Sequence, residues 1–87
     1  MDYIGLGRRI RAQRKLQGMT QKTLAEKAGI SLPFYGHIER GTRKASLETI
    51  IGIANALRVS TDMLLQDSLI GTLYADDADL SARQRAL

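Results

Sequence analysis

Apolar residues recur over residues 1–65 with the spacing of amphipathic helices, and the alternation typical of strands is nearly absent. Ser or Thr stands where several of these segments begin and Gly where several end, as N-caps and C-caps require. The pattern predicts helices over about residues 4–17, 21–28, 32–40 and 47–57, and a short fifth helix from Ser60 through Leu65. We therefore expect an all-α fold of five helices joined by tight turns.

Two of the predicted helices have well-defined apolar faces. In the helix over 21–28, we expect the core to contain Leu24, Ala25 and Ala28. In the helix over 47–57, residues at i, i+3, i+6, i+7 and i+10 form a single face: Leu47, Ile50, Ile53, Ala54 and Leu57. A chain of 87 residues has room for one modest core, so these faces predict one small domain.

The C-terminal part has a different character. We divide the chain into a helical domain, residues 1–66, and a C-terminal tail, residues 67–87. Within the tail, "SLIGTLY" has mixed strand and helix character, and "SARQ" matches a capping box. The tail is therefore either disordered, a dimer contact, or the site where a further helix begins and is cut short.

Charge is distributed unevenly along the sequence. Residues 1–58 hold eleven Lys and Arg against four Asp and Glu, whereas residues 59–87 hold two against five. A basic first part favours binding to a polyanion such as nucleic acid, although charged residues also simply solvate helix surfaces. There is no apolar run of about 20 residues for a membrane span, no signal-peptide pattern and no Cys. We expect no membrane association and a cytoplasmic location.

The segments 21–28 and 32–40 are joined by "AGIS", with Gly29 at the corner and apolar Ile30 after it. Two short helices around a Gly-containing turn describe a helix-turn-helix, in which the second helix can enter the major groove of DNA. The pattern alone is weak evidence, because corners between two helices are common in structural bundles. It becomes specific only together with the surrounding sequence.

"RIRAQRKLQGMTQKTLAEKAGIS", "IERG" and "SLETIIGIANALRVSTDMLL" together resemble the XRE family, the Cro and lambda-repressor type of helix-turn-helix regulator. The resemblance covers about residues 6–65. It implies a five-helix all-α domain that binds double-stranded operator DNA in the major groove as a homodimer. The chain would then be a bacterial, nucleoid-associated transcriptional regulator, and a repressor is the form that we expect.

The resemblance also assigns roles to single residues. It implies a structural ion pair between Arg14 and Glu39. The implied base-contacting residues are Leu32, Pro33, Gly36 and His37. The implied contacts to the DNA backbone are Thr20, Gln21, Phe34, Arg40, Thr42, Arg43 and Lys44. The residues expected to contact a dimer partner are apolar and lie beyond the DNA-binding helices: Leu64, Leu65, Leu69 and Ile70.

The base-facing residues depart from the family pattern, whose members often carry Gln, Ser, Thr, Arg or Asn there. Leu32 and Pro33 offer only apolar contact, suited to a thymine methyl group. Gly36 allows close approach of the duplex or of a neighbouring side chain. His37 alone offers a polar contact, for instance donation to guanine N7 or O6, so we expect DNA shape to supply further specificity.

Several residues keep a second interpretation. His37 is otherwise an exposed helix residue without a role, and Phe34 otherwise packs against the preceding helix. Arg8, Arg9 and Arg11 extend the basic surface only collectively, since helix geometry cannot direct all three at DNA.

Enzymatic activity is not expected. One His, no Cys and no acidic cluster in the folded part leave no nucleophile–base pair and no metal site, and no cofactor is implied. Asp76, Asp77 and Asp79 lack the spacing and the closing Glu of an EF-hand loop. The alternatives that remain are a protein-interaction module on the same fold, an antitoxin, and a restriction-modification controller.

Overall fold

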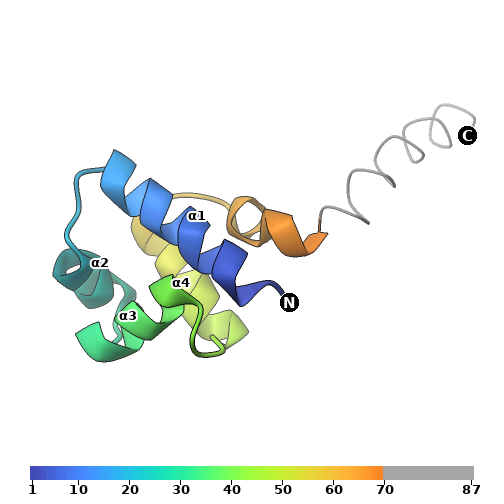
Figure 1. Cartoon of the computed structure of the whole chain (residues 1–87). Helices are drawn as coiled ribbons and strands as arrows, with labels where there is room; N and C mark the ends of the chain where they lie inside the picture. The colour runs from blue at the N-terminus through green and yellow to red at the C-terminus, as the bar shows by residue number, and fades with distance from the viewer. Residues whose placement is uncertain (70–87) are drawn as a thin grey trace, which may run out of the picture.

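The computed structural model describes residues 1–69, and in this range the chain forms five helices and no strand. They are α1 (Tyr3–Leu16), α2 (Gln21–Ala28), α3 (Leu32–Arg40), α4 (Leu47–Leu57) and a fifth helix over residues 61–69. Figure 1 shows α1 running across the molecule above α2 and α3, with the fifth helix, in orange, near the chain start. The predicted all-α fold is confirmed.

The observed helix bounds agree with the sequence pattern except in the first and fifth helices. The first helix ends at Leu16, one residue before its predicted end. It begins at Tyr3, one residue earlier than expected, because Asp2 caps it by accepting a hydrogen bond from the Gly5 N–H at 2.7 Å. The fifth helix does not end at Leu65, since residues 66–69 are also helical. Its start is as predicted, with the Met63 N–H donating to the Ser60 hydroxyl at 3.2 Å.

Local sequence explains why the other helices begin and end where they do. Thr20, Ser31 and Ser46 each accept a hydrogen bond from the backbone N–H three residues later, at 3.0, 3.3 and 3.1 Å. Gly29 closes α2 in the left-handed region, with φ of 73°, which a residue with a side chain adopts only at a cost. These signals lie within a few residues of each helix end, which is why the sequence reveals them.

The core is built where α1 packs on α3 and α2 packs on both α3 and α4. Its fully buried large side chains are Leu6, Ile10, Leu24, Tyr35, Ile38, Ile53, Leu57 and Leu64. Two expectations about the core need correction. Leu47, placed by periodicity on the buried face of α4, is 66% exposed because it stands at the first position of the helix, and Ala28 is only half-buried.

The contact between α1 and α3 is close because of a glycine. A Cβ atom added to Gly7 would lie 2.3 Å from the carbonyl oxygen of Glu39 and 2.6 Å from that of Ile38. No side chain can occupy that space without moving one helix backbone away from the other. Gly7 therefore sets the distance at which α1 crosses α3.

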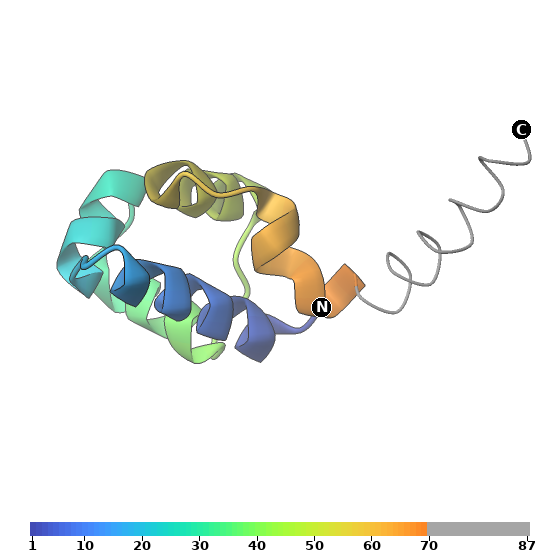
Figure 2. The ribbon, with the colours of Figure 1, turned by 90° about the horizontal axis from the view of Figure 1, so that it is seen from above.

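The beginning of the chain is attached to residues 67 and 68 of the fifth helix. The Asp2 N–H donates to the Ser68 hydroxyl at 2.8 Å, and Arg9 holds Asp67 through two bonds of 2.8 and 2.9 Å. The two segments lie side by side in both views (Figures 1 and 2). The neighbouring Arg9 also lowers the pKa of the Asp67 carboxyl. These long-range bonds, absent from any local pattern, hold residues 67 and 68 of the fifth helix against the start of the chain and α1.

Parts of the predicted C-terminal tail lie outside the described residues: Ile70, the rest of "SLIGTLY", the acidic residues Asp76, Asp77 and Asp79, and the "SARQ" box. Within residues 1–69, no helix is long and apolar enough to cross a membrane.

Candidate nucleic-acid interface

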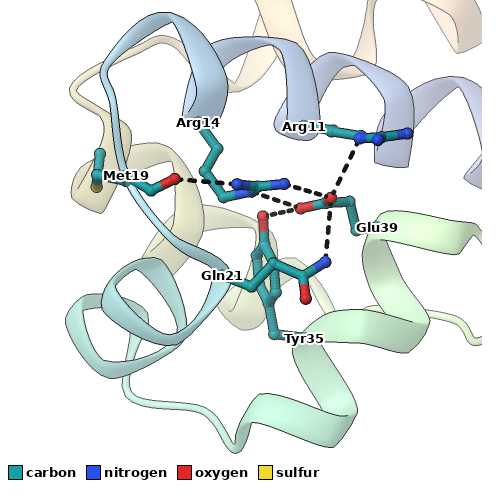
Figure 3. A network of polar contacts seen from close by, with 6 residues as sticks. All are labelled: Arg11, Arg14, Met19, Gln21, Tyr35 and Glu39. Atoms are coloured by element: carbon teal, nitrogen blue, oxygen red, sulfur yellow. Dashed lines mark hydrogen bonds and ion pairs between the residues drawn. The ribbon is translucent and has the colours of Figure 1, made fainter.

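The side chain of Glu39, near the end of α3, is almost completely buried and receives several hydrogen bonds. Arg14 donates to it from Nε at 3.0 Å and from Nη2 at 2.9 Å. The third nitrogen of the same guanidinium donates to the carbonyl of Met19 at 2.9 Å, in the loop before α2 (Figure 3). The structure thus contains the ion pair between Arg14 and Glu39 that the family resemblance implied.

Three more side chains converge on the same carboxylate (Figure 3). The Tyr35 hydroxyl donates to Oε2, and the Gln21 amide donates to Oε1 at 3.2 Å. Arg11 forms a longer ion pair with Oε1, at 3.7 Å, from a position that is largely exposed. Sequence reasoning missed these partners, although Tyr35 stands four residues before Glu39, the spacing at which helical side chains meet.

The ionisation of this cluster follows from burial and hydrogen bonding. Burial by itself raises the pKa of the Glu39 carboxyl, but the bonds from Arg14, Tyr35 and Gln21 outweigh it and lower that pKa below its ordinary value. Burial, and then the bond to Glu39, raise the pKa of the Tyr35 phenol. The bond to Glu39 likewise raises the pKa of Arg14. Glu39 is therefore an ionised carboxylate. It contacts two positively charged groups, Arg14 and Arg11, and two neutral ones, Tyr35 and Gln21.

The Glu39 cluster joins three segments of the helix-turn-helix region: α1 through Arg14, the start of α2 through Gln21, and α3 through Tyr35. Because every bond ends on one buried carboxylate, α3 cannot rotate or slide without breaking several of them. The side chains on the outer face of α3 are consequently presented in one orientation.

The outer face of α3 contains the residues predicted to contact bases. Leu32 is 43% exposed, Pro33 is exposed and His37 is half-buried. Gly36 departs from the prediction, because it is buried within the protomer. Apart from its two chain neighbours and the backbone of α3, the three heavy atoms nearest to where its Cβ would lie all belong to the Arg40 guanidinium, the nearest at 3.0 Å.

His37 has a hydrogen-bonded partner just beyond the helix. Its Nδ1 lies 2.8 Å from the Thr42 hydroxyl, which itself donates to the His37 carbonyl at 3.2 Å. A hydroxyl has one proton, so Thr42 then accepts from Nδ1–H. In the neutral ring this leaves Nε2 as a hydrogen-bond acceptor, without a partner among residues 1–69.

The predicted backbone contacts fall into two groups. Arg40, Thr42, Arg43 and Lys44 are all exposed, at or just after the end of α3. Within residues 1–69, Arg43 and Lys44 have no hydrogen bond or ion pair to another group. The other three are already engaged: Thr20 caps α2, Gln21 binds Glu39, and Phe34 packs partly against the core.

Of the three α1 arginines expected to extend the basic surface, two form ion pairs within the protein. Arg9 is bound to Asp67 and Arg11 lies near Glu39, whereas Arg8 is exposed. Their expected collective role on a basic surface is thus reduced, since two of the three charges are partly neutralised.

The residues predicted as dimer contacts differ in how deeply they are buried. Leu64 is fully buried in the core, so its side chain is not available to a partner, in contrast to the prediction. Its helical position directs it inward while Leu65 and Leu69 stay half-buried. Sequence reasoning missed two exposed apolar residues one turn apart on α4: Leu47, and Ile51 at 43% exposure.

Comparison with known proteins explains this architecture. A family model described as helix-turn-helix matches residues 10–64, more than half of the chain. The chain belongs to the XRE family of helix-turn-helix transcriptional regulators. The match spans the cluster around Glu39 and the outer face of α3.

Individual relatives are similar over most of the same part of this chain. An uncharacterized HTH-type transcriptional regulator of Bacillus subtilis, YazB, is 50% identical over 58 residues, which cover 67% of this chain and 84% of that protein. The immunity repressor protein of Bacillus phage phi105 is 35% identical over 65 residues, 75% of this chain and 45% of that protein.

Among solved structures, the restriction-modification controller protein C.AhdI from Aeromonas hydrophila superposes with a TM-score of 0.70. It is 36% identical, and the match covers 72% of this chain and 96% of that one. As an XRE regulator, the protein is a member of a non-enzymatic family with a DNA-binding fold. The outer face of α3 and the loop that follows it are the candidate surface for that DNA.

Proposed function

We propose that the protein is a transcriptional repressor that binds, as a homodimer, a palindromic operator in double-stranded DNA. The observation that carries this proposal is the Glu39 cluster, which holds α3 against α1 and α2 so that one face of the helix is presented rigidly to solvent. A fixed, exposed second helix beside unpaired basic residues is what insertion into a major groove requires.

The basic residues after α3 support the DNA-binding part of the proposal. Arg43 and Lys44 are exposed, and neither has an acidic partner within residues 1–69. Phosphate contacts of this kind supply affinity without sequence information, and they make binding fall steeply with salt. Leu32 and Pro33 add an apolar edge that suits thymine methyl groups.

Selection of bound sequences from random duplex DNA, with the full chain, tests this proposal. A consensus with two inverted half-sites about one helical turn apart is expected. A salt titration on that consensus, with Arg43→Ala beside wild type, adds a second measure. The variant should lose affinity for all sequences and reduce the salt slope by about 1.8, which is about 0.9 for each subunit of the dimer. If no sequence is enriched and salt does not affect the binding, the result would instead favour a protein-interaction module.

The dimer is tested separately from DNA binding. Leu65 and Leu69, on the fifth helix, are half-buried and remain the proposed contacts, while Leu47 and Ile51 on α4 form an exposed alternative. Sedimentation of Leu65→Asp and Leu47→Asp distinguishes the two surfaces, because a charge destabilises only the interface in which it is buried. If both variants and the wild type sediment as monomers with and without DNA, the homodimer is wrong.

A restriction-modification controller is the second candidate. It is favoured by the similarity to C.AhdI, a protein of that kind that is 36% identical to this chain. A promoter fused to a reporter, carrying the selected sequence, separates the two roles. Expression that only decreases as the protein accumulates supports a repressor, whereas expression that first rises and then falls supports a controller.

A further inference from the structure

Apart from Nε2 of His37, the outer face of α3 has no polar side-chain group for reading bases unless Arg40 is included. Leu32 and Pro33 are apolar, and Gly36 has no side chain. His37 is held by Thr42. Arg40 is exposed and, within residues 1–69, its guanidinium has neither a hydrogen bond nor an ion pair. An unpaired guanidinium on this face needs an explanation beyond helix solvation.

Helix geometry places Arg40 in the middle of that face. At about 100° per residue, Leu32, Gly36 and Arg40 lie at about 0°, 40° and 80° around the axis of α3. Pro33 and His37 follow at about 100° and about 140°, so all five positions share one face. Tyr35 and Ile38 point the other way, and both are buried in the core. The position is thus part of the outer face and not of the loop that follows it.

Gly36 explains where the Arg40 side chain goes. Helical side chains lean toward the N-terminus, so a residue at i+4 covers the residue at i. Here the guanidinium lies over Gly36, with Nη1 3.0 Å from the place where a Cβ atom would be. Because no side chain stands there, the charged group of Arg40 lies one turn back, at the level of the predicted base contacts.

We infer that Arg40 is a specificity-determining residue that reads guanine. Gly36 positions it, because the absence of a side chain at Gly36 leaves the space in which the Arg40 guanidinium lies. This rests on the proposed function, since it assumes that α3 enters a major groove. Guanine presents N7 and O6 as two acceptors in that groove, and the guanidinium fork matches them with two donors. Arg40 was expected to contact phosphate, where its position would carry no sequence information.

The test compares selected sequences and relative affinities for wild type, Arg40→Ala, Gly36→Ala and the loop variant Arg43→Ala. For wild type we expect guanine at one base pair of each half-site, preferred about 10- to 100-fold over the other bases. Arg40→Ala should lose the preference at that base pair and keep it elsewhere. Arg43→Ala should weaken all sequences equally and change no preference.

Gly36→Ala tests whether the missing side chain at position 36 positions Arg40, and it does so without destabilising the fold. Ala favours a helix over Gly, so this variant should melt at a higher temperature than wild type. Its methyl group would meet Nη1 at 3.0 Å and displace the guanidinium, so guanine discrimination should fall at the same base pair. In the Arg40→Ala background, Gly36→Ala should change discrimination no further.

Three results would contradict the roles inferred for Arg40 and Gly36. If Arg40→Ala weakens every sequence equally, as Arg43→Ala does, then Arg40 is a phosphate contact and the inference is wrong while the proposed function stands. If Gly36→Ala leaves discrimination unchanged, Gly36 does not position Arg40. If wild type enriches no sequence, the proposed function fails, and the inference fails with it.

Discussion

Arg14 faces Glu39 across the contact between α1 and α3, with two of its nitrogens 3.0 and 2.9 Å from the two carboxylate oxygens. The two residues are 25 positions apart in the chain, and both side chains are largely withdrawn from water. This pair holds α3 in place, although neither residue belongs to the outer face of α3. We therefore expect changes at Glu39 to affect both the stability of the fold and the proposed binding of DNA.

Arg14→Ala should lower the free energy of unfolding by about 3–5 kcal/mol, because it leaves a buried carboxylate without its main partner. Arg11→Ala is the matched control. Arg11 contacts the same carboxylate at 3.7 Å, but its side chain is 58% exposed, so the loss should stay below about 1 kcal/mol. Urea unfolding of both variants measures the difference, and equal losses would contradict it.

Stability should depend on pH through Glu39. Its carboxyl has a lower pKa in the folded chain than the ordinary value of 4.5, so the unfolded chain binds more protons between those two values. The stabilising contribution is complete above about pH 4.5 and is lost as the pH falls through the folded pKa. We expect the stability difference between wild type and Glu39→Gln to shrink on acidification. A difference that stays constant from about pH 7 to about pH 3 would rule this out.

Gly7→Ala should destabilise the protein, although the same change usually favours a helix by about 1 kcal/mol. The added methyl group would meet the backbone carbonyls of Glu39 and Ile38, so α1 and α3 must separate. Thermal unfolding gives the sign directly. A rise in melting temperature would show that the two helices are not held at this distance.

His37 should prefer a base that donates a hydrogen bond. In the neutral ring with Nδ1–H bonded to Thr42, only Nε2 is available, and it accepts. The adenine N6 and cytosine N4 amino groups are such donors in the major groove. At the base pair whose preference disappears in His37→Ala, removing the exocyclic amino group of the adenine or cytosine should abolish the preference of the wild type as well, and Thr42→Val should weaken it. Loss of the preference on replacing guanine by 7-deazaguanine, which lacks the N7 acceptor, would mean that the ring donates instead.

The sequence by itself determined the helices. Caps at Thr20, Ser31 and Ser46, the glycine after α2 and the 3.6-residue period all act within a few residues, so the bounds of α2, α3 and α4 follow from local patterns. The family resemblance also implied the pair of Arg14 with Glu39. Periodicity failed for Leu47, because a residue at the very start of a helix can face solvent while the rest of its stripe is buried.

Only the tertiary structure decided which side chains are available at the candidate interface. Burial of Leu64, the bond from Arg9 to Asp67, and the approach of Gln21 and Tyr35 to Glu39 all depend on how the helices pack. The position of the Arg40 guanidinium over Gly36 is likewise a contact in space. A sequence pattern states which residues share a helix face, but packing determines which of their polar groups are already bound and which remain free for DNA.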